Sequence, residues 1–560
     1  MPESEVGLKS GLEWLDFAAI LGYLALTFGI AIWFGRRQKD TEDFFVGGRS
    51  VPWFAVGLSI LATLFSTISY LGGPGEVIKN GLGVYAGYLA LPLCAVVIFR
   101  YWIPFFMRLR LTSAYEYLEL RYNPGTRMLG ATLFVLMRLG WMSVVVYAAS
   151  LALDKIKGPD LEFLPGKDLY WWIGAVGLIA AVYTAVGGIQ AMIWTDVLQC
   201  ILLLLGVVLA ISYVAIVDHT GPMDWWRTAA NTSGRSNLPP FFVPDITVRV
   251  TFVWAAINVF FWQVCTHGSD QVVLQRYFST PSVSAARRSY CVNLGVDILM
   301  AILLSLCGLA LLAHYLKHPT QTPEGLPPVK AAEKLFPHFL GNQLPAGFAG
   351  LIISAFLCDA IQTLESGVNA ITAVATADLI PKLRRFKWLS WSDLAWARVL
   401  SVVVALLVTA NAYFVANRVE AIGETLVGLS PKFFNMFVGP LAALFIIGMF
   451  MPRCTARSAL PAMACGLGVS FVWSWWTEIF GTLVPYVLTK LGTSTDQIAW
   501  EKFSTECRPT FLLAIAVPVL VTLGMAFILG RLLERNVDHA GRQYTWRAVL
   551  SRPETPNPTL

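Results

Sequence analysis

The segment QAMIWTDVLQCILLLLGVVLAISYVAI, residues 190–216, decides the fold class, and Asp196 is its only charged residue. An α-helix rises about 1.5 Å per residue, so roughly 20 apolar residues cross the hydrocarbon core of a bilayer. Similar apolar runs recur along the 560 residues, of which 56% are hydrophobic and 14% charged, and the mean hydropathy is +0.62. A soluble domain carries about 25% charged residues. The sequence therefore predicts an all-α integral membrane protein.

The apolar runs predict thirteen transmembrane helices within one transporter domain, residues 15–532. Residues 1–14 precede it as an outer N-terminus, and residues 533–560 follow as a tail that we expect to be cytoplasmic. The tail is polar after Arg535, and we expect that part to be disordered. The predicted spans are 15–34, 53–77, 83–107, 127–153, 170–186, 190–216, 250–274, 289–314, 346–378, 394–416, 424–450, 457–478 and 509–531.

Basic residues fall in alternate loops if the spans number thirteen, with Arg36 and Arg37 after the first span and Arg384 and Arg385 after the ninth. Loops rich in Lys and Arg stay on the cytoplasmic side. We therefore expect the N-terminus outside and the C-terminus inside, in a plasma or inner membrane. The net charge of +6 reflects this topology and not a nucleic-acid partner. The first 16 residues lack the basic start of a cleaved signal peptide, so the first span is expected to remain.

Two predicted spans are interrupted. The second ends in GGPGE (residues 72–76), and the seventh contains CTHGSDQ (residues 265–271). Each opens a group of five spans. Backbone leaves the helix at membrane depth only where it lines a cavity or lies within protein, and matching breaks in two halves are typical of a transporter binding site. The alternative is a simple kink or helix end at each place.

Ionisable side chains inside a membrane helix cost several kcal/mol unless they are paired or hydrated. Asp196 could hold a cation or form a structural pair with a buried donor. Arg138 could bind a substrate carboxylate bidentately, or could neutralise a carboxylate of the protein. The charged residues singled out within the predicted spans are Arg138, Asp196, Asp297, Asp359 and Glu365.

The ninth span carries a polar stripe. Its members are spaced i, i+3, i+4, i+7 and i+10, so they share one helix face, and Glu365 lies on its flank. Oxygen-bearing side chains suit a hard cation such as sodium, so the stripe predicts an ion path, with polar contacts between helices as the alternative. The members are Asp359, Gln362, Thr363, Ser366 and Asn369.

Several ordered motifs resemble the sodium:solute symporter family over residues 12–530. They are DFFVGGRSVPW (43–53), TSAYEYLELR (112–121), WTDVLQ (194–199), SDQ (269–271), QRY (275–277), SGVN (366–369), GP (439–440) and MPR (451–453). Members of this family carry sugars, amino acids, vitamins, iodide or monocarboxylates.

The resemblance implies a LeuT-like fold with ten core helices in two inverted five-helix repeats, at about residues 52–217 and 250–450. One helix precedes the core and two follow it. The implied function is sodium-coupled symport of a small organic solute or anion by alternating access, in a transporter and not an enzyme. Sodium is then the coupling ion and the only metal, with no other cofactor. The expected partners are the solute, sodium and the lipid bilayer, without nucleic acid, and the protein is expected to act as a monomer.

The resemblance also implies site residues. The family's main sodium site matches backbone carbonyls of Ala62 and Phe65 and side chains of Asp359, Gln362 and Thr363. A second ion site matches Asp196, Glu365 and Ser366, with Gln362 shared between the two sites. Substrate positions match Ser69, Arg138, Thr266, His267 and Gln271.

The chain departs from the family pattern at these sites. The family usually has a small residue at position 359, Ser at 362, and a hydroxyl residue or Asp at 365. Ser69 and His267 differ from the sugar carriers, and residues 72–76 look closer to the vitamin and anion carriers. A proton-coupled carrier using Asp359 or Glu365 is therefore the alternative on the same fold. A sensor or channel lacks support, and the sequence offers no evident His or Cys cluster with metal-binding spacing.

Overall fold

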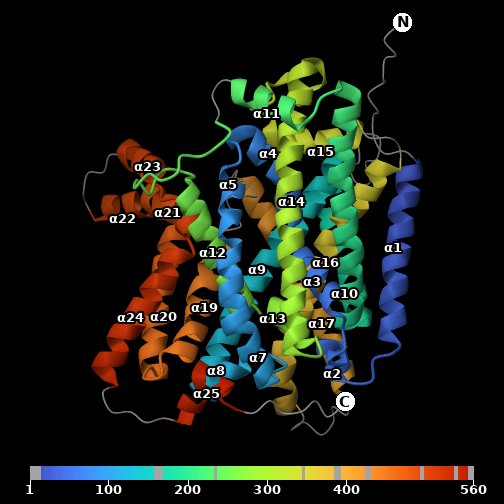
Figure 1. The fold of residues 1–560 in the computed structure, drawn as a ribbon. Coiled ribbons are helices and arrows are strands. Elements are labelled where there is room, and N and C mark those ends of the chain that lie inside the picture. The colour runs from blue at the N-terminus through green and yellow to red at the C-terminus, as the bar shows by residue number, and fades with distance from the viewer. Residues whose placement is uncertain are drawn as a thin grey trace, which may run out of the picture. The chain divides into compact units, whose positions relative to one another are not determined.

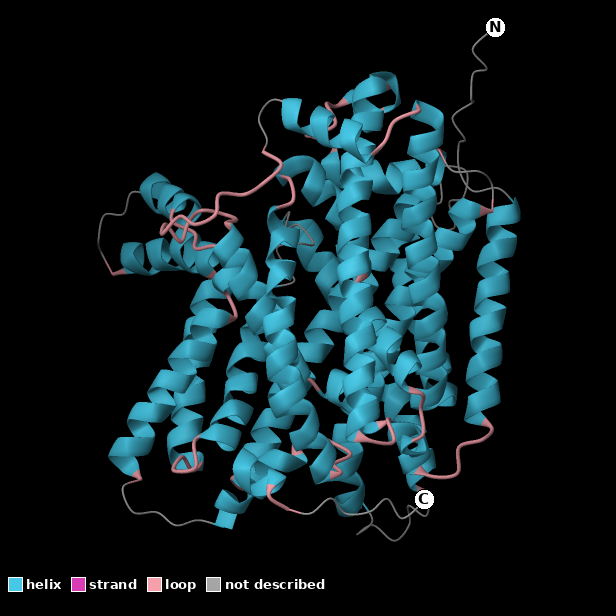
Figure 2. Ribbon diagram, in the orientation of Figure 1, coloured by secondary structure: helices cyan, strands magenta, loops and turns pink. Residues whose placement is uncertain are grey.

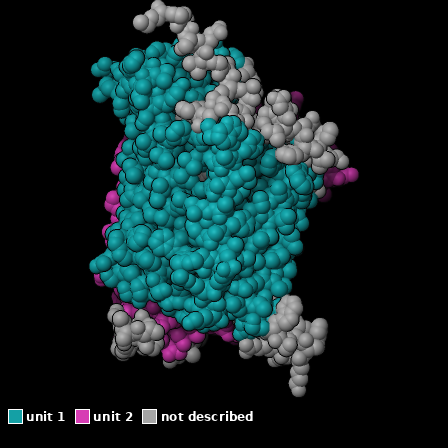
Figure 3. Space-filling view, turned by 90° about the vertical axis from the view of Figure 1, so that its right-hand side faces the viewer, with its two compact units in different colours: residues 1–85, 142–239, 279–426 teal, residues 86–141, 240–278, 427–560 magenta. Residues whose placement is uncertain are grey.

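The computed structural model describes residues 14–156, 168–232, 236–343, 347–383, 392–422, 431–491, 497–534 and 540–552. Within these ranges the regular secondary structure is entirely helical, which confirms the all-α prediction (Figure 2). The chain divides into two compact units, each assembled from three separate segments (Figure 3). Unit 1 contains residues 1–85, 142–239 and 279–426, and unit 2 contains residues 86–141, 240–278 and 427–560.

Unit 1 contains the longest helices (Figure 1). The helix α9 contributes its second half here and its first half to unit 2. The helices are α1 (Trp14–Gly35), α2 (Thr41–Val46), α3 (Trp53–Leu64), α4 (Thr67–Asn80), α9 (Pro124–Ile156), α10 (Asp168–Asp218), α11 (Pro222–Asn231), α14 (Val283–Lys317), α15 (Ala332–Asn342), α16 (Phe348–Leu383) and α17 (Asp393–Ile422).

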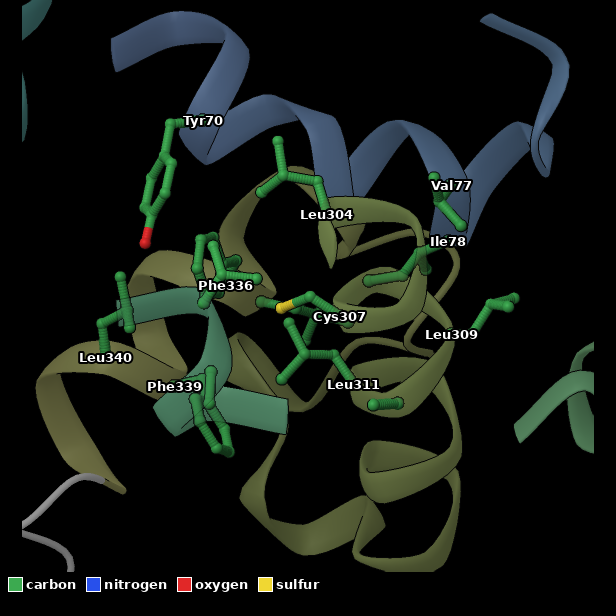
Figure 4. Close-up of a cluster of buried hydrophobic side chains, with 14 of the residues drawn as sticks. Tyr70, Val77, Ile78, Leu304, Cys307, Leu309, Leu311, Phe336, Phe339 and Leu340 are labelled. Atoms are coloured by element: carbon green, nitrogen blue, oxygen red, sulfur yellow. The ribbon is translucent and has the colours of Figure 1, made fainter. Parts of the chain in front are cut away.

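An apolar cluster joins α4, α14 and α15 within unit 1 (Figure 4). Tyr70 of α4, Leu304 of α14 and Phe336 of α15 are all fully buried in it. Tyr70 also donates a hydrogen bond of 3.0 Å to the carbonyl of Leu203 in α10. These contacts fix the second half of the broken span against α10 and α14.

Helix α10 consists of two helical stretches joined at a kink at Gly188, which has φ of 63° and ψ of −179°. Only glycine adopts this conformation readily. A β-carbon at this position would also lie 2.3 Å from the Nε2 atom of Gln38, whose amide donates to the carbonyl of Gly187 at 2.6 Å. The predicted break at Gly187–Gly188 is therefore confirmed, whereas its separation of two membrane spans stays a prediction.

Unit 2 contains shorter helices. The apolar span 83–109, which belongs to unit 2 from residue 86 onward, is interrupted by a π-helical turn, η3 (Ile98–Trp102). The helices are α6 (Leu91–Val97), α7 (Ile103–Leu109), α8 (Glu116–Arg121), α12 (Phe252–Ser269), α13 (Gln271–Phe278), α19 (Met436–Phe450), α20 (Ala456–Ser474), α21 (Trp476–Glu478), α22 (Val484–Lys490), α23 (Gln497–Glu506), α24 (Ala516–Leu533) and α25 (Trp546–Leu550), and the short α5 (Gly83–Ala86) lies at the boundary of the units.

Eight helices within the described residues are long and apolar enough to cross a membrane. The number rises to ten if each of two sharply bent helix pairs counts as one span. Multiple bilayer-spanning helices are thus confirmed, whereas the count of thirteen stays a prediction.

The prediction of a disordered tail is wrong for residues 540–552. A short 3-10 helix, η9 (Ala540–Tyr544), and α25 continue the chain within unit 2. Arg108 of α7 donates a hydrogen bond to the carbonyl of Leu550, and the rings of Tyr101 and Trp546 lie 5.2 Å apart. An aromatic and a hydrogen-bonded contact hold a segment whose polar composition alone suggested disorder.

Candidate functional site

The second predicted span is broken between α3 and α4, where Phe65 and Ser66 have extended backbone. Helical hydrogen bonding in α3 ends with the Phe65 N–H, which donates to the carbonyl of Leu61 at 2.8 Å. Helix α4 begins with Ser66 as its N-cap, because the Ser66 Oγ accepts the N–H of Ser69 at 3.3 Å. The prediction placed the interruption at residues 72–76, and this position is wrong, since those residues are helical within α4.

The position of the break matters for cation binding. The last four carbonyl groups of an α-helix have no amide partner in the same helix. In α3 these carbonyls include that of Ala62, and Phe65 is the residue directly after the helix end. The family resemblance matched the carbonyls of these two residues to the main sodium site. The break therefore leaves backbone carbonyl oxygens without helical partners, and such oxygens are ligands that suit a hard cation.

The polar stripe of α16 is buried, as a stripe that faces protein must be. Gln362 and Thr363 are 3% and 5% exposed, and Glu365 and Asn369 are fully buried. Both amide atoms of Gln362 lack a hydrogen-bond partner among the residues that the structure describes. Helix α16 packs on α3 and on α10 inside unit 1. Asp359 belongs to α16, but its side chain lies outside the described residues.

Asp196 is fully buried in α10 and accepts a hydrogen bond from the Ser59 hydroxyl of α3. One turn earlier in α10, the sulfur atom of Met192 accepts a hydrogen bond of 3.4 Å from the Ser366 hydroxyl of α16. A β-carbon on Gly187 would lie 3.4 Å from an oxygen of Glu365. The structure thus brings α10 alongside the stripe over the stretch that contains the predicted second ion site.

The break in the seventh predicted span is confirmed. Helix α12 ends at Ser269, Asp270 has extended backbone, and α13 begins at Gln271. Arg138 of α9 forms an ion pair with Asp270, whose other oxygen accepts the N–H of Val272 at 3.0 Å. Side-chain exposure is 3% for the arginine and 0% for the aspartate. The Arg138 Nε atom is buried without a hydrogen-bond partner in the described part of the chain.

Gln271 is held by the backbone of the TSAYEYLELR segment. Its Oε1 accepts the N–H of Ala114 at 2.7 Å, and its Nε2 donates to the carbonyl of Thr112 at 2.8 Å. Tyr115 from the same segment donates to the carbonyl of Ser269 at 3.0 Å. The two motifs thus stabilise one broken helix, and both polar groups of the Gln271 amide already have protein partners.

The remaining predicted substrate positions differ in accessibility. His267 is buried, with its Nδ1 2.7 Å from the hydroxyl of Tyr277. Thr266 is also buried and donates to the carbonyl of Trp262 at 2.7 Å. Ser69 is exposed and belongs to α4. Arg138, Thr266, His267 and Gln271 lie in unit 2, whereas Ser69 lies in unit 1.

Sequence reasoning missed two partners. Asp270 was quoted in the SDQ motif but was not counted among the charged residues of the spans, and it is the partner of Arg138. Its place within the predicted seventh span, in the polar interruption CTHGSDQ, was the available signal. Ser59 carried no such signal, because a serine inside a membrane helix usually bonds to its own backbone. Here it donates to Asp196.

The geometry defines a class of protein. The chain has bilayer-spanning helices and two spans broken inside the protein, and a buried stripe of oxygen-bearing side chains lies on α16, which packs on α3. This construction is typical of a secondary transporter for an ion and a solute.

The chain belongs to the sodium:solute symporter family, whose model matches residues 44–466. It is 30% identical to the sodium/sialic acid symporter NanT of Aliivibrio fischeri, over 80% of this chain and 85% of the relative. It is 30% identical to the human sodium/iodide cotransporter, over 87% of this chain and 73% of the relative. The solved substrate-bound, outward-open structure of a Na⁺-coupled sialic acid symporter matches with a TM-score of 0.72 and 25% identity, covering 93% of this chain and 98% of that one.

These similarities confirm the predicted family and the LeuT-like fold. The protein is a multi-pass membrane transporter and not an enzyme. It couples movement of a small-molecule substrate to sodium, which is the coupling ion.

Proposed function

We propose that the substrate is a small anion and that Arg138 contacts it. The observation that carries the proposal is the state of the guanidinium group. Asp270 engages one terminal nitrogen, whereas the buried Nε–H has no hydrogen-bond partner among the described residues. A guanidinium group has five N–H donors, so Arg138 can donate to a carboxylate or halide while it stays paired with Asp270. The relatives' names, which specify sialic acid and iodide, support an anion.

The main sodium ion is proposed to bind at the end of α3 in unit 1. Its ligands are the carbonyls of Ala62 and Phe65 with the side chains of Gln362, Thr363 and Asp359. The support is the helix break at Phe65 together with the unpartnered, buried amide of Gln362. Sodium binding joins α3 to α16, which favours the outward-open state. Release of the ion follows when these helices separate, and the linkage between ion and solute is a reciprocal coupling free energy.

A second cation is proposed between α10 and α16, with Asp196, Glu365 and Ser366 as ligands. Two carboxylates near one ion strengthen binding, but without an ion one of them tends to hold a proton. Glu365 or Asp359 could therefore carry a proton alongside sodium. Asp196→Asn is expected to weaken the sodium dependence of uptake, and unchanged uptake and sodium affinity in that variant would reject the assignment.

The topology proposed from loop charge places the N-terminus outside and the C-terminus in the cytoplasm of a plasma or inner membrane. Residues 15–532 form the transporter domain, with core repeats at about 52–217 and 250–450. A monomer contains all the proposed ligands, which supports function without a partner subunit.

The substrate proposal is tested by sodium-driven uptake into proteoliposomes, with sialic acid, a short monocarboxylate, iodide and a neutral sugar as probes. We expect uptake of at least one anion and none of the neutral sugar. Accumulation of the sugar alone would overturn the proposal.

The role of Arg138 needs a variant that does not leave Asp270 unpaired. Arg138→Gln combined with Asp270→Asn removes both charges and should fold but lose anion uptake. Arg127→Gln is the matched control, because Arg127 lies in the same helix and pairs with a partly exposed glutamate. Full uptake by the folded double variant would show that Arg138 does not bind the substrate.

A further inference from the structure

Two histidines and an aspartate meet where α10 and α14 end, away from the proposed sodium ligands. Asp218 is the last residue of α10, and His314 and His318 are one helical turn apart at the end of α14. The His314 Nδ1–H donates to one carboxylate oxygen of Asp218 at 2.8 Å, and the His318 Nε2–H donates to the other at 2.8 Å. One ligand atom from each residue can be chosen so that all three lie within 4.8 Å of one another.

The cluster is enclosed on one side and open on the other. Asp218 and His314 are each 2% exposed, whereas His318 is 32% exposed. The ring of Phe339 in α15 packs edge-on against His314, with centroids 5.8 Å apart, and Phe339 belongs to the apolar cluster of Figure 4. Two ligands are therefore fixed by packing, and the third faces the side from which an ion can enter.

We propose that Asp218, His314 and His318 form a binding site for a divalent transition-metal ion, of which zinc fits best. Imidazole nitrogen and carboxylate oxygen are the usual protein ligands of zinc, and three such ligands leave a fourth position for water. The sequence alone did not reveal this cluster, because Asp218 lies 96 residues before His314 and the two meet only in the folded protein. The pair His314 and His318, spaced i and i+4, was the signal.

Metal binding requires the two N–H groups that now face Asp218 to become lone pairs. Each proton can move to the other ring nitrogen or be released. For His314 that nitrogen is Nε2, which is buried and has no hydrogen-bond partner within the described ranges. Lys317 lies 3.6 Å from the Asp218 carboxylate, but its side chain is 53% exposed and can turn toward solvent when the ion arrives. The ion would then link the ends of α10 and α14.

The test uses the purified full-length protein in lipid nanodiscs after EDTA treatment. Cobalt(II) absorption and zinc competition report binding, and thermal unfolding with and without zinc reports linkage to the folded state. We expect one saturable cobalt-binding site that zinc displaces, together with stabilisation by zinc. His318→Ala or Asp218→Asn should weaken binding by about tenfold or more.

Two further variants sharpen the test. Lys317→Gln removes a positive charge close to the site, so it should tighten binding by about fivefold. His338→Gln is the matched control, because His338 contacts Tyr315 and lies outside the cluster; its affinity should equal that of the unmodified protein. Two results would show that the cluster is only a hydrogen-bonded helix contact. One is the absence of saturable cobalt binding, and the other is a metal affinity in His318→Ala and Asp218→Asn equal to that of the unmodified protein.

Discussion

The ion pair of Arg138 and Asp270 gives the sharpest prediction for stability. Asp270→Asn removes the negative partner but keeps the size of the side chain and an oxygen that can accept the Val272 N–H. The guanidinium group then remains buried without its counter-charge, since its side chain is only 3% exposed. The helix break that Asp270 stabilises should weaken with it.

The magnitude follows from the burial of both partners. Two unit charges at about 4 Å attract by roughly 4 kcal/mol at an effective dielectric constant of about 20. Removal of one member of a buried pair costs about 3–5 kcal/mol, because the remaining charge is uncompensated. We therefore expect Asp270→Asn to lower the free energy of unfolding by about 3–5 kcal/mol. The variant Arg138→Gln, combined with Asp270→Asn, should regain most of this loss.

The assay is equilibrium unfolding in mixed micelles by SDS titration, followed by helical circular dichroism, for the parent, both single variants and the double variant. A double-mutant cycle isolates the interaction between the two side chains. Each single variant leaves one buried charge uncompensated, so we expect a coupling energy of at least about 3 kcal/mol. Additive effects, with a coupling energy below about 0.5 kcal/mol, would refute the inference that this pair stabilises the break.

Three further predictions concern the proposed ion site, the α10 break and the turn at residues 245–247. Thr363→Ala should raise the sodium concentration for half-maximal uptake by about tenfold, equivalent to about 1.4 kcal/mol. Thr363→Ser keeps the hydroxyl and should behave as the parent. Equal sodium dependence of the parent and both variants would exclude Thr363 as a ligand. Gly188→Ala should cost about 1–3 kcal/mol in the SDS titration, because of the positive φ, while the control Gly295→Ala, which has open space around it, should not. The pKa of Asp245 is lowered by hydrogen bonds from the backbone and side chain of Thr247. The turn is therefore stabilised at pH values above the usual aspartate pKa, and it loses that stability as the pH falls through the lowered pKa. Protection of the Thr247 amide from hydrogen exchange should decrease on acidification, and unchanged protection would contradict this prediction.

The sequence predicted the class of fold well because each bilayer span needs a long apolar run, and such runs are visible without an alignment. Gly187–Gly188 marked the break in α10 correctly, since a positive φ demands glycine. The other glycine run misled the prediction. Two glycines of this run serve close packing: a β-carbon would lie 2.3 Å from the Tyr85 hydroxyl at Gly73 and 2.8 Å from the carbonyl of Ala332 at Gly75. A glycine in a membrane helix can therefore mark a close helix contact as well as a break.

The position of the break between α3 and α4 could not be predicted from residue types alone. Phe65 has no turn signal, and the N-cap Ser66 is one of several hydroxyl residues nearby. The buried face of α16, by contrast, follows from helical spacing, because a polar stripe on a membrane helix must face protein. Which residue pairs with Arg138 depends on tertiary contact between α9 and the α12–α13 break, and one sequence does not contain that information.

We propose that sodium drives uptake of an anion through this chain. The direct measurement is accumulation of the transported anion in proteoliposomes with a sodium gradient at equal pH on both sides, compared with a pH gradient at equal sodium, each at a clamped membrane potential. Accumulation that follows the sodium gradient, with little response to pH alone, is the predicted result. Accumulation that follows the pH gradient and ignores sodium would contradict it.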